Sequence, residues 1–355
     1  MKDNLIGLQN EVKKISMDIL DLLNRRISLI EEMKNARDED VAATIDQVRE
    51  LRLIEEIVGE DNAPGYNNMI REIFSVIFNT TIKYAGLSKE KKLLVGKRHG
   101  IKPQTIQDIT GQNVDLPMII AGPCAIEQYD YLDKVAGFLA SKKVKFLRGG
   151  AYKPRTSPYD FQGLREEGLK MIREIGRKYD LMTVTEVVDT RTVQLVAEYV
   201  NILQVGSRNM YNYELLKEVG RTNKPILLKR GLSATIQEFI YAAEYIALQG
   251  NNKIILCERG IRTFENKTRN TLDISSIPIL KAETSLPIIA DISHSLGRKD
   301  IAASIARAIL AVGADGMMME VHPYPKLAFS DNEQQLDFNE FTDLMEAIDL
   351  KYNSA

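Results

Sequence analysis

The sequence predicts an α/β protein, a (β/α)₈ TIM barrel preceded by an all-α segment of three helices. From residue 118 onward, short apolar runs rich in β-branched residues alternate with amphipathic helical stretches, which is typical of a parallel sheet. Eight such runs follow one another in about 230 residues, and this length suits a barrel of eight strand–helix units. Before residue 87, apolar residues recur at helical spacing instead.

The first 86 residues are predicted to form three helices in a domain of their own. The apolar residues of the first helix include Ile15, Ile19 and Leu22, and turn-forming residues cluster at 38–40 and 62–65. The basic, unpatterned stretch Ser88–Gly100 is predicted to be a solvated linker. We therefore divide the chain into a helical domain (1–86), a linker and barrel lead-in (87–117) and the barrel (118–355).

Eight strands are predicted in the second part of the chain. A doubly wound sheet is the alternative, but no G-x-G-x-x-G follows a strand and no G-x-x-x-x-G-K-[ST] occurs, so the main sequence reasons for a nucleotide fold are missing. The predicted strands are Met118–Cys124, Val144–Gly150, Leu181–Val187, Ile202–Arg208, Pro225–Gly231, Lys253–Gly260, Leu286–His294 and Ala314–Pro323.

The composition narrows the class of ligand. With 47 Lys and Arg against 49 Asp and Glu, the formal charge of −2 gives no reason to expect nucleic acid or a membrane surface as a partner. No uncharged apolar run is long enough to span a bilayer. Two cysteines and a charged start, MKDNLIGLQNEVKK, predict a cytoplasmic protein whose partners are small molecules.

Each predicted strand ends in a side chain capable of chemistry. In a barrel the carboxyl ends of the strands meet at one face, where barrel enzymes build their active sites. Charges at the ends of otherwise apolar strands are costly without partners or ligands, so we expect one shared site rather than unrelated surface residues. The eight residues are Cys124, Arg148, Glu186, Arg208, Lys229, Arg259, His294 and Glu320.

Cations dominate this set and the loop AYKPRTSP that follows the second predicted strand. Planar guanidinium groups bind carboxylate and phosphate oxygens two at a time, and six cations exceed what one phosphate requires. Two phosphorylated substrates, or a phosphate and a carboxylate, fit better, although any one of these residues taken alone could form a surface ion pair. The six are Arg148, Lys153, Arg155, Arg208, Lys229 and Arg259.

A candidate metal site combines Cys124, His294 and Glu320 with Asp331 of the segment LAFSDNE. Mixed sulfur, nitrogen and oxygen ligands suit Mn²⁺, Fe²⁺ or Zn²⁺ better than Mg²⁺. No local motif such as H-E-x-x-H supports this set, so Cys124 as a plain core cysteine remains the alternative. Cys257 is predicted to belong to the barrel core. His322 is expected at most to support the metal ligands from outside the metal site.

Several motifs together resemble the 3-deoxy-D-arabino-heptulosonate 7-phosphate (DAHP) synthase family, in its shorter-chain subgroup. The likeness runs from about Pro117 to about residue 345. It implies a transferase that condenses phosphoenolpyruvate with erythrose 4-phosphate, the first step of the shikimate pathway to the aromatic amino acids. The motifs are GPC (122–124), LRGGAYKPRTSPYDFQG (147–163), GSRN (206–209), LLKRG (227–231), LCERGIRTFE (256–265), DISHS (291–295) and EVHPYPKLAFSD (320–331).

The resemblance implies a role for each site residue. It implies that the divalent metal ligands are Cys124, His294, Glu320 and Asp331. Phosphoenolpyruvate would be held by Arg148, Lys153, Arg208, Lys229 and Arg259, and the phosphate of erythrose 4-phosphate by Arg155 and Thr156. As catalytic residues we expect Lys153, Glu186 and Lys229, the last two to hold and deprotonate water and Lys153 to protonate the new alkoxide.

Two other enzyme classes are alternatives to a DAHP synthase. The sister family, 3-deoxy-manno-octulosonate 8-phosphate synthase, usually has K-A-N-R-[ST] where this chain has Lys153-Pro154-Arg155-Thr156, the form that goes with the four-carbon aldose. A Schiff-base aldolase using Lys229 is the second, because a lysine on a barrel strand near phosphate sites is typical of that class too. A pathway sensor without catalysis would need a defective set of site residues, and all matched positions are intact.

Residues 1 to about 86 resemble the all-helical chorismate mutase family. Arg26, Arg49 and Glu50 fall on family positions, and Arg37 stands where a lysine is usual. Gln9 replaces an arginine, so we expect weak or absent mutase activity with chorismate or prephenate retained as a feedback effector. A helical dimerisation arm without a site is the alternative. The protein is expected to be a homodimer or homotetramer.

Overall fold

The computed structural model describes residues 2–35, 56, 64–84, 93–97, 102–113, 117–154, 157 and 159–352. The chain divides into two compact units, Met1–Lys92 and Leu93–Ala355. Within the described ranges, no helix combines the length and the apolar composition needed to cross a lipid bilayer.

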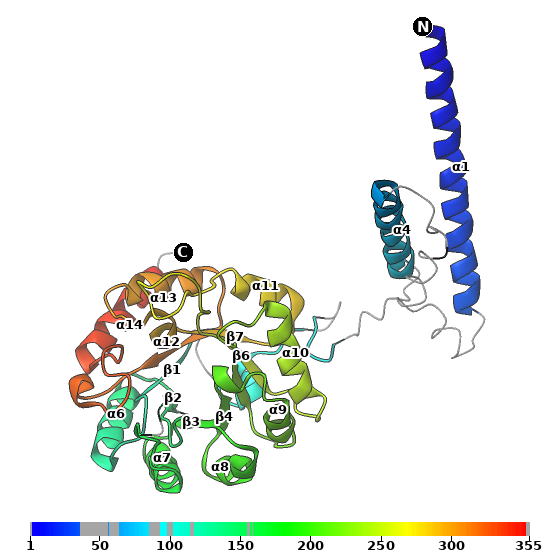
Figure 1. Ribbon diagram of the computed structural model, residues 1–355. Helices are drawn as coiled ribbons and strands as arrows, with labels where there is room; N and C mark the ends of the chain where they lie inside the picture. The colour runs from blue at the N-terminus through cyan, green and yellow to red at the C-terminus, as the bar shows by residue number, and fades with distance from the viewer. Residues whose placement is uncertain are drawn as a thin grey trace. The chain divides into compact units, whose positions relative to one another are not determined.

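The second unit is a closed barrel of eight parallel strands in sequential order (Figure 1). The barrel closes where the first strand pairs with the last, in a register that sets Met118 opposite Gly316 and Gly122 opposite Glu320. The predicted (β/α)₈ fold is confirmed, and the doubly wound alternative is wrong because this closure leaves no open sheet edge. The strands are β1 (Met118–Gly122), β2 (Phe146–Arg148), β3 (Met182–Val187), β4 (Ile202–Val205), β5 (Ile226–Lys229), β6 (Ile254–Glu258), β7 (Ile288–Asp291) and β8 (Gly316–Glu320).

Four of the eight residues predicted at strand ends lie beyond their strands. β1 stops at Gly122 and β6 at Glu258, so Cys124 and Arg259 follow them. β7 stops at Asp291, and the next residues form the helix α12 (Ile292–Leu296), so His294 lies on a helical turn rather than at a strand end. The Asp291 side chain accepts a hydrogen bond from the His294 N–H and caps this helix, which ends at Gly297 with a left-handed φ of 65°. Arg208 likewise lies beyond β4, in the 3₁₀ turn Ser207–Asn209.

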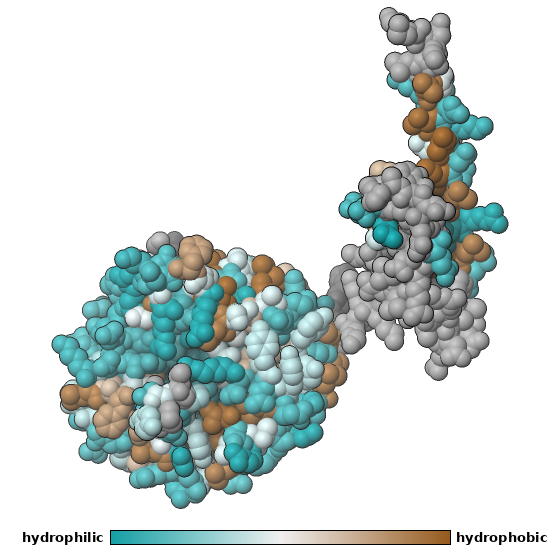
Figure 2. All heavy atoms as spheres, viewed as in Figure 1, coloured by the Kyte–Doolittle hydropathy of each residue, from teal (hydrophilic) through white to brown (hydrophobic). Residues whose placement is uncertain are grey.

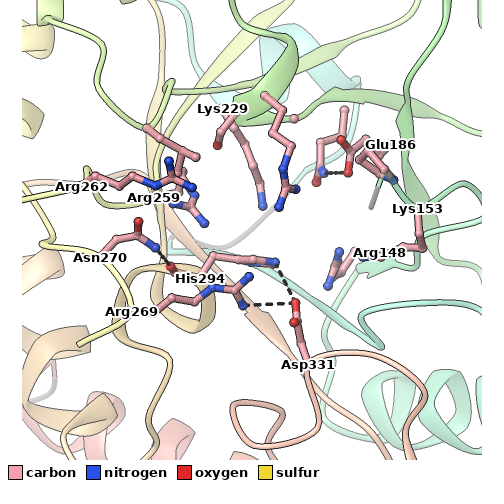
Figure 3. Close-up of a pocket in the computed structure, with 16 residues that line it drawn as sticks. Arg148, Lys153, Glu186, Lys229, Arg259, Arg262, Arg269, Asn270, His294 and Asp331 are labelled. Atoms are coloured by element: carbon pink, nitrogen blue, oxygen red, sulfur yellow. Dashed lines mark hydrogen bonds and ion pairs between the residues drawn. The ribbon is translucent and has the colours of Figure 1, made fainter. Parts of the chain in front are cut away.

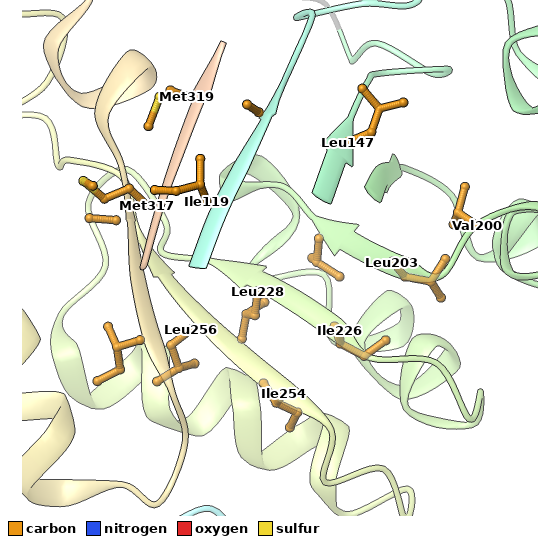
Figure 4. Packing of buried hydrophobic residues seen from close by; sticks show 14 of the residues in the cluster. Ile119, Leu147, Val200, Leu203, Ile226, Leu228, Ile254, Leu256, Met317 and Met319 are labelled. Carbon is orange, nitrogen blue, oxygen red and sulfur yellow. The ribbon is translucent and has the colours of Figure 1, made fainter. Parts of the chain in front are cut away.

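Alternating strand residues build two separate apolar layers. Ile120, Phe146 and Leu227 belong to a cluster inside the barrel, whereas Ile119 and Leu228 belong to the larger cluster between sheet and helices (Figure 4). Successive side chains of a strand point to opposite faces. A residue two positions after a member of the inner cluster therefore also faces the barrel interior. Cys257 is fully buried in the inner cluster, so its prediction as barrel core is confirmed.

Helices surround the sheet and begin at recognisable signals (Figure 1). Thr235 and Glu238 form a reciprocal capping box at the start of α10. The helices after β1 are α6 (Tyr129–Ser141), α7 (Glu166–Lys178), α8 (Val193–Tyr199), α9 (Tyr213–Gly220), α10 (Ile236–Ala247), α11 (Ser276–Glu283), α12, α13 (Ala302–Ala311) and α14 (Phe338–Tyr352), with 3₁₀ turns at Thr190–Thr192, Ser207–Asn209 and Pro325–Leu327.

The lead-in to the barrel packs against it. Val95 is buried in the outer cluster, and its N–H donates to the Glu244 carboxylate. The helix α5 (Ile106–Thr110) places Ile106 and Ile109 in the inner cluster. The prediction of a solvated linker is therefore wrong for residues 93–97, because Val95 adds to the outer cluster and Leu93 packs against it.

The first unit contains the long helix α1 (Lys2–Asn35) and α4 (Pro64–Tyr84). The Arg26 guanidinium lies over the Phe78 ring, 4.3 Å from its centroid. Apolar side chains along α1 remain exposed, and Figure 2 shows them as a brown stripe. The second predicted helix lies outside the described residues except for Glu56, and so do Arg37, Arg49 and Glu50. The exposed members on α1 are Leu8, Val12, Ile15, Met17, Ile19, Leu20, Leu22 and Leu29.

Candidate active site

The alternation of strand residues aims the site side chains into the barrel. Phe146 lies in the inner cluster, so Arg148, two residues on, faces the same interior. The same rule turns Glu320 inward after Met318 and Lys229 inward after Leu227. All of these residues stand at the carboxyl ends of their strands, the face at which barrel enzymes carry their active sites.

A pocket opens at this face, and seven of its sixteen lining residues are cationic (Figure 3). Every predicted cation that the structure describes lines it, and Glu186, His294 and Asp331 share its wall. Arg155 and Thr156 lie outside the described residues. The seven cationic residues are Arg148, Lys153, Arg208, Lys229, Arg259, Arg262 and Arg269.

Two of these cations, Arg262 and Arg269, were not predicted. Both lie in the segment after β6, beyond the strand end that carries Arg259. The Arg262 N–H donates to the Leu232 carbonyl at 2.7 Å, which ties this segment to the one after β5. The motif LCERGIRTFE contains Arg262, but its spacing gives no indication that the chain folds back over the pocket.

Glycine lies at two close approaches of the rim, and the backbone contact at Gly122 requires it. At Gly122, whose φ is +147°, an added Cβ would lie 2.0 Å from the Arg148 carbonyl oxygen. At Gly206 it would lie 2.0 Å from the Glu186 Oε1. These two glycines allow neighbouring strand ends to bring Arg148 and Glu186 to the pocket.

The four predicted metal ligands come together beside this pocket. The ligand atoms of Cys124, Glu320 and Asp331 all lie within 4.8 Å of one another. The His294 Nε2 lies 3.4 Å from the Glu320 Oε1 and 3.8 Å from the Asp331 Oδ2. One sulfur, one nitrogen and two carboxylates from four segments therefore converge, and this donor set fits a divalent transition metal.

Asp291 orients the histidine of this set. Its Oδ2 lies 2.8 Å from the His294 Nδ1, and because a carboxylate only accepts, the proton is on Nδ1 and the Nε2 lone pair faces the other ligands. Burial lowers the pKa of His294 despite the nearby carboxylates. A carboxylate behind a histidine in this manner is the usual support of a metal-binding imidazole. This role of Asp291 is not predicted from the sequence.

The protonation of the other ligands also depends on their surroundings. Burial, reinforced by Glu320, raises the pKa of the Cys124 thiol to about 12. Burial acts to raise the pKa of Glu320 too, but His294, Arg148 and Lys153 outweigh it and hold that pKa well below its usual value. The cluster thus contains a neutral thiol and an ionised carboxylate, and a bound cation would displace the thiol proton.

Three cations are held in place by Asp291 and by residues of the candidate metal cluster. The Arg148 Nη1 donates to the Glu320 Oε1 at 2.6 Å, and Lys229 forms a buried ion pair with Asp291. The Lys153 Nζ lies 3.1 Å from both the Sγ and the carbonyl oxygen of Cys124. The cationic pocket and the candidate metal cluster are therefore one connected site.

Other cations of the pocket are left available for a ligand. Arg259 is 6% exposed, and among the described residues it has no carboxylate partner within salt-bridge distance. Burial lowers the pKa of its guanidinium. The Arg148 Nε, also buried, has no hydrogen-bond partner among the described residues. Buried charge without a partner favours a site built for an anion.

A closed (β/α)₈ barrel with a cationic mouth beside a Cys, His, Glu and Asp cluster defines a barrel protein suited to anionic ligands. The model of the DAHP synthetase I family matches residues 95–352. The chain belongs to the DAHP synthetase I family.

Relatives of two kinds occur in this comparison. A phospho-2-dehydro-3-deoxyheptonate aldolase of Thermotoga maritima is 56% identical over 230 residues, which cover 65% of this chain and 68% of that protein. A 2-dehydro-3-deoxyphosphooctonate aldolase of Syntrophobacter fumaroxidans is 30% identical over 261 residues, which cover 68% of this chain and 90% of that protein.

Solved structures agree with the first of these relatives. The crystal structure of the phospho-2-dehydro-3-deoxyheptonate aldolase (DAHP synthase) from Thermotoga maritima has a TM-score of 0.69 at 48% identity, covering 74% of this chain and 77% of that chain. A truncated form of the 3-deoxy-D-arabino-heptulosonate 7-phosphate synthase from the same organism has a TM-score of 0.68 at 47% identity, covering 74% of this chain and 96% of that chain.

Proposed function

We propose that the protein is a cytoplasmic DAHP synthase that condenses phosphoenolpyruvate with erythrose 4-phosphate, releasing phosphate, in aromatic amino acid biosynthesis. The observation that carries this proposal is the connection of seven pocket cations to the Cys124–His294–Glu320–Asp331 cluster through the Arg148–Glu320 pair. Two anionic substrates that must be held side by side require such a density of positive charge. The 56% identity to a heptonate aldolase supports the choice of reaction.

In this proposal Cys124, His294, Glu320 and Asp331 hold a divalent metal ion, Mn²⁺, Fe²⁺ or Zn²⁺. The fit rests on the donor set and on the support of the imidazole by Asp291. When bound, such an ion supplies Lewis acidity toward a carbonyl oxygen. Dialysis against a chelator should abolish condensation, and restoring Mn²⁺, Fe²⁺ or Zn²⁺ in turn should identify the ion; full activity after chelation would contradict the metal site.

Arg148, Lys153, Arg208, Lys229 and Arg259 are proposed to bind phosphoenolpyruvate. Arg259 and the free Nε of Arg148 supply buried donors for carboxylate or phosphate oxygens. Arg155 and Thr156 are proposed to bind the phosphate of erythrose 4-phosphate, on the strength of the Lys153-Pro154-Arg155-Thr156 sequence.

The chemistry then follows from three side chains of the pocket wall. Attack of C3 of phosphoenolpyruvate on the aldehyde carbon forms the new bond, and Lys153 donates a proton to the resulting alkoxide. Glu186, which accepts a hydrogen bond from Gln204 at 3.4 Å, takes a proton from the water that adds to C2, while Lys229 orients that water. Expulsion of phosphate with cleavage of the C–O bond completes the reaction.

The ion pair of Lys229 argues against a Schiff-base aldolase. Its partner Asp291 has a pKa held well below its usual value by His294 and Lys229 in spite of burial. The Lys229 Nζ is thus held by a buried carboxylate and is not free to attack a carbonyl carbon. Borohydride with either substrate should leave Lys229 unmodified; a trapped adduct at Lys229 in chelated, active enzyme would establish the aldolase instead.

The choice of aldose separates this proposal from an octonate synthase. The 30% identity to an octonate aldolase is far lower than the 56% to the heptonate enzyme. We expect turnover with erythrose 4-phosphate and at least about a hundredfold lower kcat/KM with arabinose 5-phosphate, because the longer aldose would misplace its phosphate or its aldehyde. Equal turnover of both aldoses would contradict the assignment.

For the first unit we propose feedback control by chorismate or prephenate, bound through Arg26, Arg37, Arg49 and Glu50. The cationic Arg26 on α1 supports a dicarboxylate site, and Gln9 on the same helix predicts weak or absent mutase activity. Arg26→Ala in the full chain should weaken inhibition 5- to 150-fold, in the range of about 1 to 3 kcal/mol typical of coupling. The exposed neighbour Arg25, changed to Ala, is the control, and equal inhibition of both variants would contradict the effector site.

A homodimer or homotetramer is proposed from the exposed apolar stripe of α1. Val12, Ile15, Ile19 and Leu22 recur at helical spacing and are each more than half exposed in the single chain. Sedimentation of the full chain should give a dimer or tetramer, and Ile15→Glu combined with Ile19→Glu should shift it toward monomer. A monomeric wild-type chain would contradict this part of the proposal.

A further inference from the structure

Two adjacent glutamines lie behind the candidate metal cluster. Gln334 is 5% exposed and Gln335 is fully buried. They belong to a short segment that runs beside the end of β8, where the Leu336 N–H donates to the Glu320 carbonyl at 2.8 Å and the His322 N–H donates to the Leu336 carbonyl at 2.9 Å. This pairing fixes both glutamines against the strand end that carries Glu320.

Gln335 joins two segments that supply ligands. Its Oε1 accepts from the Cys124 N–H at 3.0 Å, and its Nε2 donates to the Ser330 carbonyl at 2.8 Å. Because an N–H only donates and a carbonyl only accepts, these partners fix the orientation of the amide. Ser330 directly precedes Asp331, so one side chain sets the spacing between the Cys124 and Asp331 backbones.

Gln334 joins the remaining oxygen ligands. Its Nε2 donates to the Glu320 Oε2 at 2.6 Å, and its Oε1 accepts from the Arg269 Nη1 at 2.7 Å. The same Nη1 lies 3.2 Å from the Asp331 Oδ2. Gln334 and Arg269 thus connect the Glu320 and Asp331 carboxylates.

The three ligands that these glutamines connect need such support because two of them do not lie on strands. Cys124 follows the end of β1, and Asp331 lies on a loop with a left-handed φ of 50°. Neutral amides provide hydrogen bonds without adding charge to a cluster that already contains two carboxylates. We propose that Gln334 and Gln335 are positioning residues that hold Cys124, Glu320 and Asp331 at the spacing a divalent cation requires, an inference that rests on the metal site proposed above.

The test is cobalt binding to the chelator-treated full chain. Co²⁺ bound by Cys124 should give a thiolate-to-cobalt charge-transfer absorption, which reports geometry at the sulfur independently of turnover. We expect Gln335→Met to lower Co²⁺ affinity about 10- to 100-fold and to weaken this absorption, because the Cys124 and Asp331 segments lose their bridge. Gln334→Met should lower the affinity by a similar factor through Glu320 and Asp331.

Asn251→Leu is the matched control. Asn251 is also 5% exposed and donates to the Thr222 and Lys224 carbonyls, but it lies at the opposite end of the barrel, before β6. It should lower thermal stability and leave cobalt affinity and absorption unchanged. If a Met variant does not fold, Gln335→Asn and Gln334→Asn, which keep an amide but cannot reach both partners, should show the same changes to a smaller degree.

Distinct results would overturn the two ideas separately. Wild-type affinity and absorption in folded Gln334 and Gln335 variants would overturn the positioning role while leaving the metal site intact. Absence of cobalt binding by the wild-type chain would overturn the metal site itself.

Discussion

The carboxyl ends of β5 and β6 carry two pairs of charged residues. The inward pair, Lys229 and Arg259, faces the barrel interior, and the outward pair, Arg230 and Glu258, faces the surrounding helices. Lys229 and Arg259 line the pocket, whereas Arg230 and Glu258 are buried in an ion network with Asp273 behind the sheet. The Arg230 Nη1 lies 2.9 Å from Glu258 and 2.8 Å from Asp273, and its Nε donates to the Ala234 carbonyl. The outward pair finds its partners within the protein. The inward Arg259 has no carboxylate partner among the described residues, and apart from one long hydrogen bond of 3.4 Å from its Nη1 to the Gly260 carbonyl its donors remain for a ligand.

The difference teaches that facing, not residue type, separates binding from structure at a barrel mouth. In the runs LLKRG and LCERG the charges are adjacent in sequence, so composition alone cannot distinguish them. The apolar residues before them can, because Leu227 and Cys257 belong to the inner cluster and Leu228 and Leu256 to the outer one. Counting in steps of two from those residues assigns Lys229 and Arg259 to the interior.

The largest effect on activity is expected for one of the two cysteines, although both are fully buried. Cys124→Ala should reduce condensation by at least about a hundredfold, because a ligand of the proposed Lewis acid is lost and several kcal/mol of transition-state stabilisation depend on that ion. Cys257→Ala should keep the rate and cost about 1 kcal/mol of stability through a small core cavity. Rates at saturating substrate and urea unfolding of both variants test this. A fully active Cys124→Ala protein would remove Cys124 from the site.

Arg230→Met should have the largest effect on stability. It leaves Glu258 buried and Asp273 half-buried without their cation, which costs about 3 to 5 kcal/mol of unfolding free energy. At a temperature where the variant is folded, kcat/KM should stay within about threefold of wild type, since no pocket residue is lost. A large loss of activity in fully folded Arg230→Met protein would show that the network also serves catalysis.

Arg259→Met should show the reverse pattern. Removing a buried guanidinium that has no carboxylate partner among the described residues should leave the free energy of unfolding unchanged or raise it. The loss of charge-assisted hydrogen bonds worth about 1.5 to 3 kcal/mol should lower kcat/KM for phosphoenolpyruvate about 10- to 150-fold. Binding of phosphoenolpyruvate by calorimetry, combined with urea unfolding, separates the two effects. Stability that falls as far as in Arg230→Met would contradict the difference between the pairs.

The sequence predicts the strands well because their signal is local. Apolar, β-branched runs marked all eight strands, and their last polar residues gave Arg148, Lys229 and Glu320. The end of β7 was wrong because Asp291 stops the strand by capping a helical turn, and a cap depends on backbone conformation more than on apolar pattern. Asp291 itself was missed for the same reason, since its role depends on the position of His294.

Residues that act across long sequence separations were beyond prediction. The Gln335 amide contacts the backbone of Cys124, 211 residues earlier, and Arg269 reaches Asp331 from another segment. Nothing local in NEQQLD marks a buried bridging amide. Val95 lies in a stretch predicted to be a linker, because three adjacent apolar residues between lysines show neither a helical nor an alternating period, although the fold buries Val95.

The smallest expected effect is a pH dependence of the free energy of unfolding that arises from Asp273, the second partner of Arg230 in the outward pair. Burial raises the pKa of Asp273, but hydrogen bonds from Arg230 and Ser275 outweigh it and hold the pKa below its usual value. A carboxylate whose pKa is lower in the folded state stabilises the fold above its unfolded value of about 3.9, and this contribution is lost as pH falls through the folded value. Asp273→Asn should therefore cost on the order of 1 kcal/mol at pH 7 and pH 5, and the difference from wild type should shrink between pH 4 and pH 2. Urea unfolding at several pH values measures it. A difference that stays constant from pH 7 to pH 2 would show that Asp273 acts through shape alone, and that the network behind the sheet is not held together by charge.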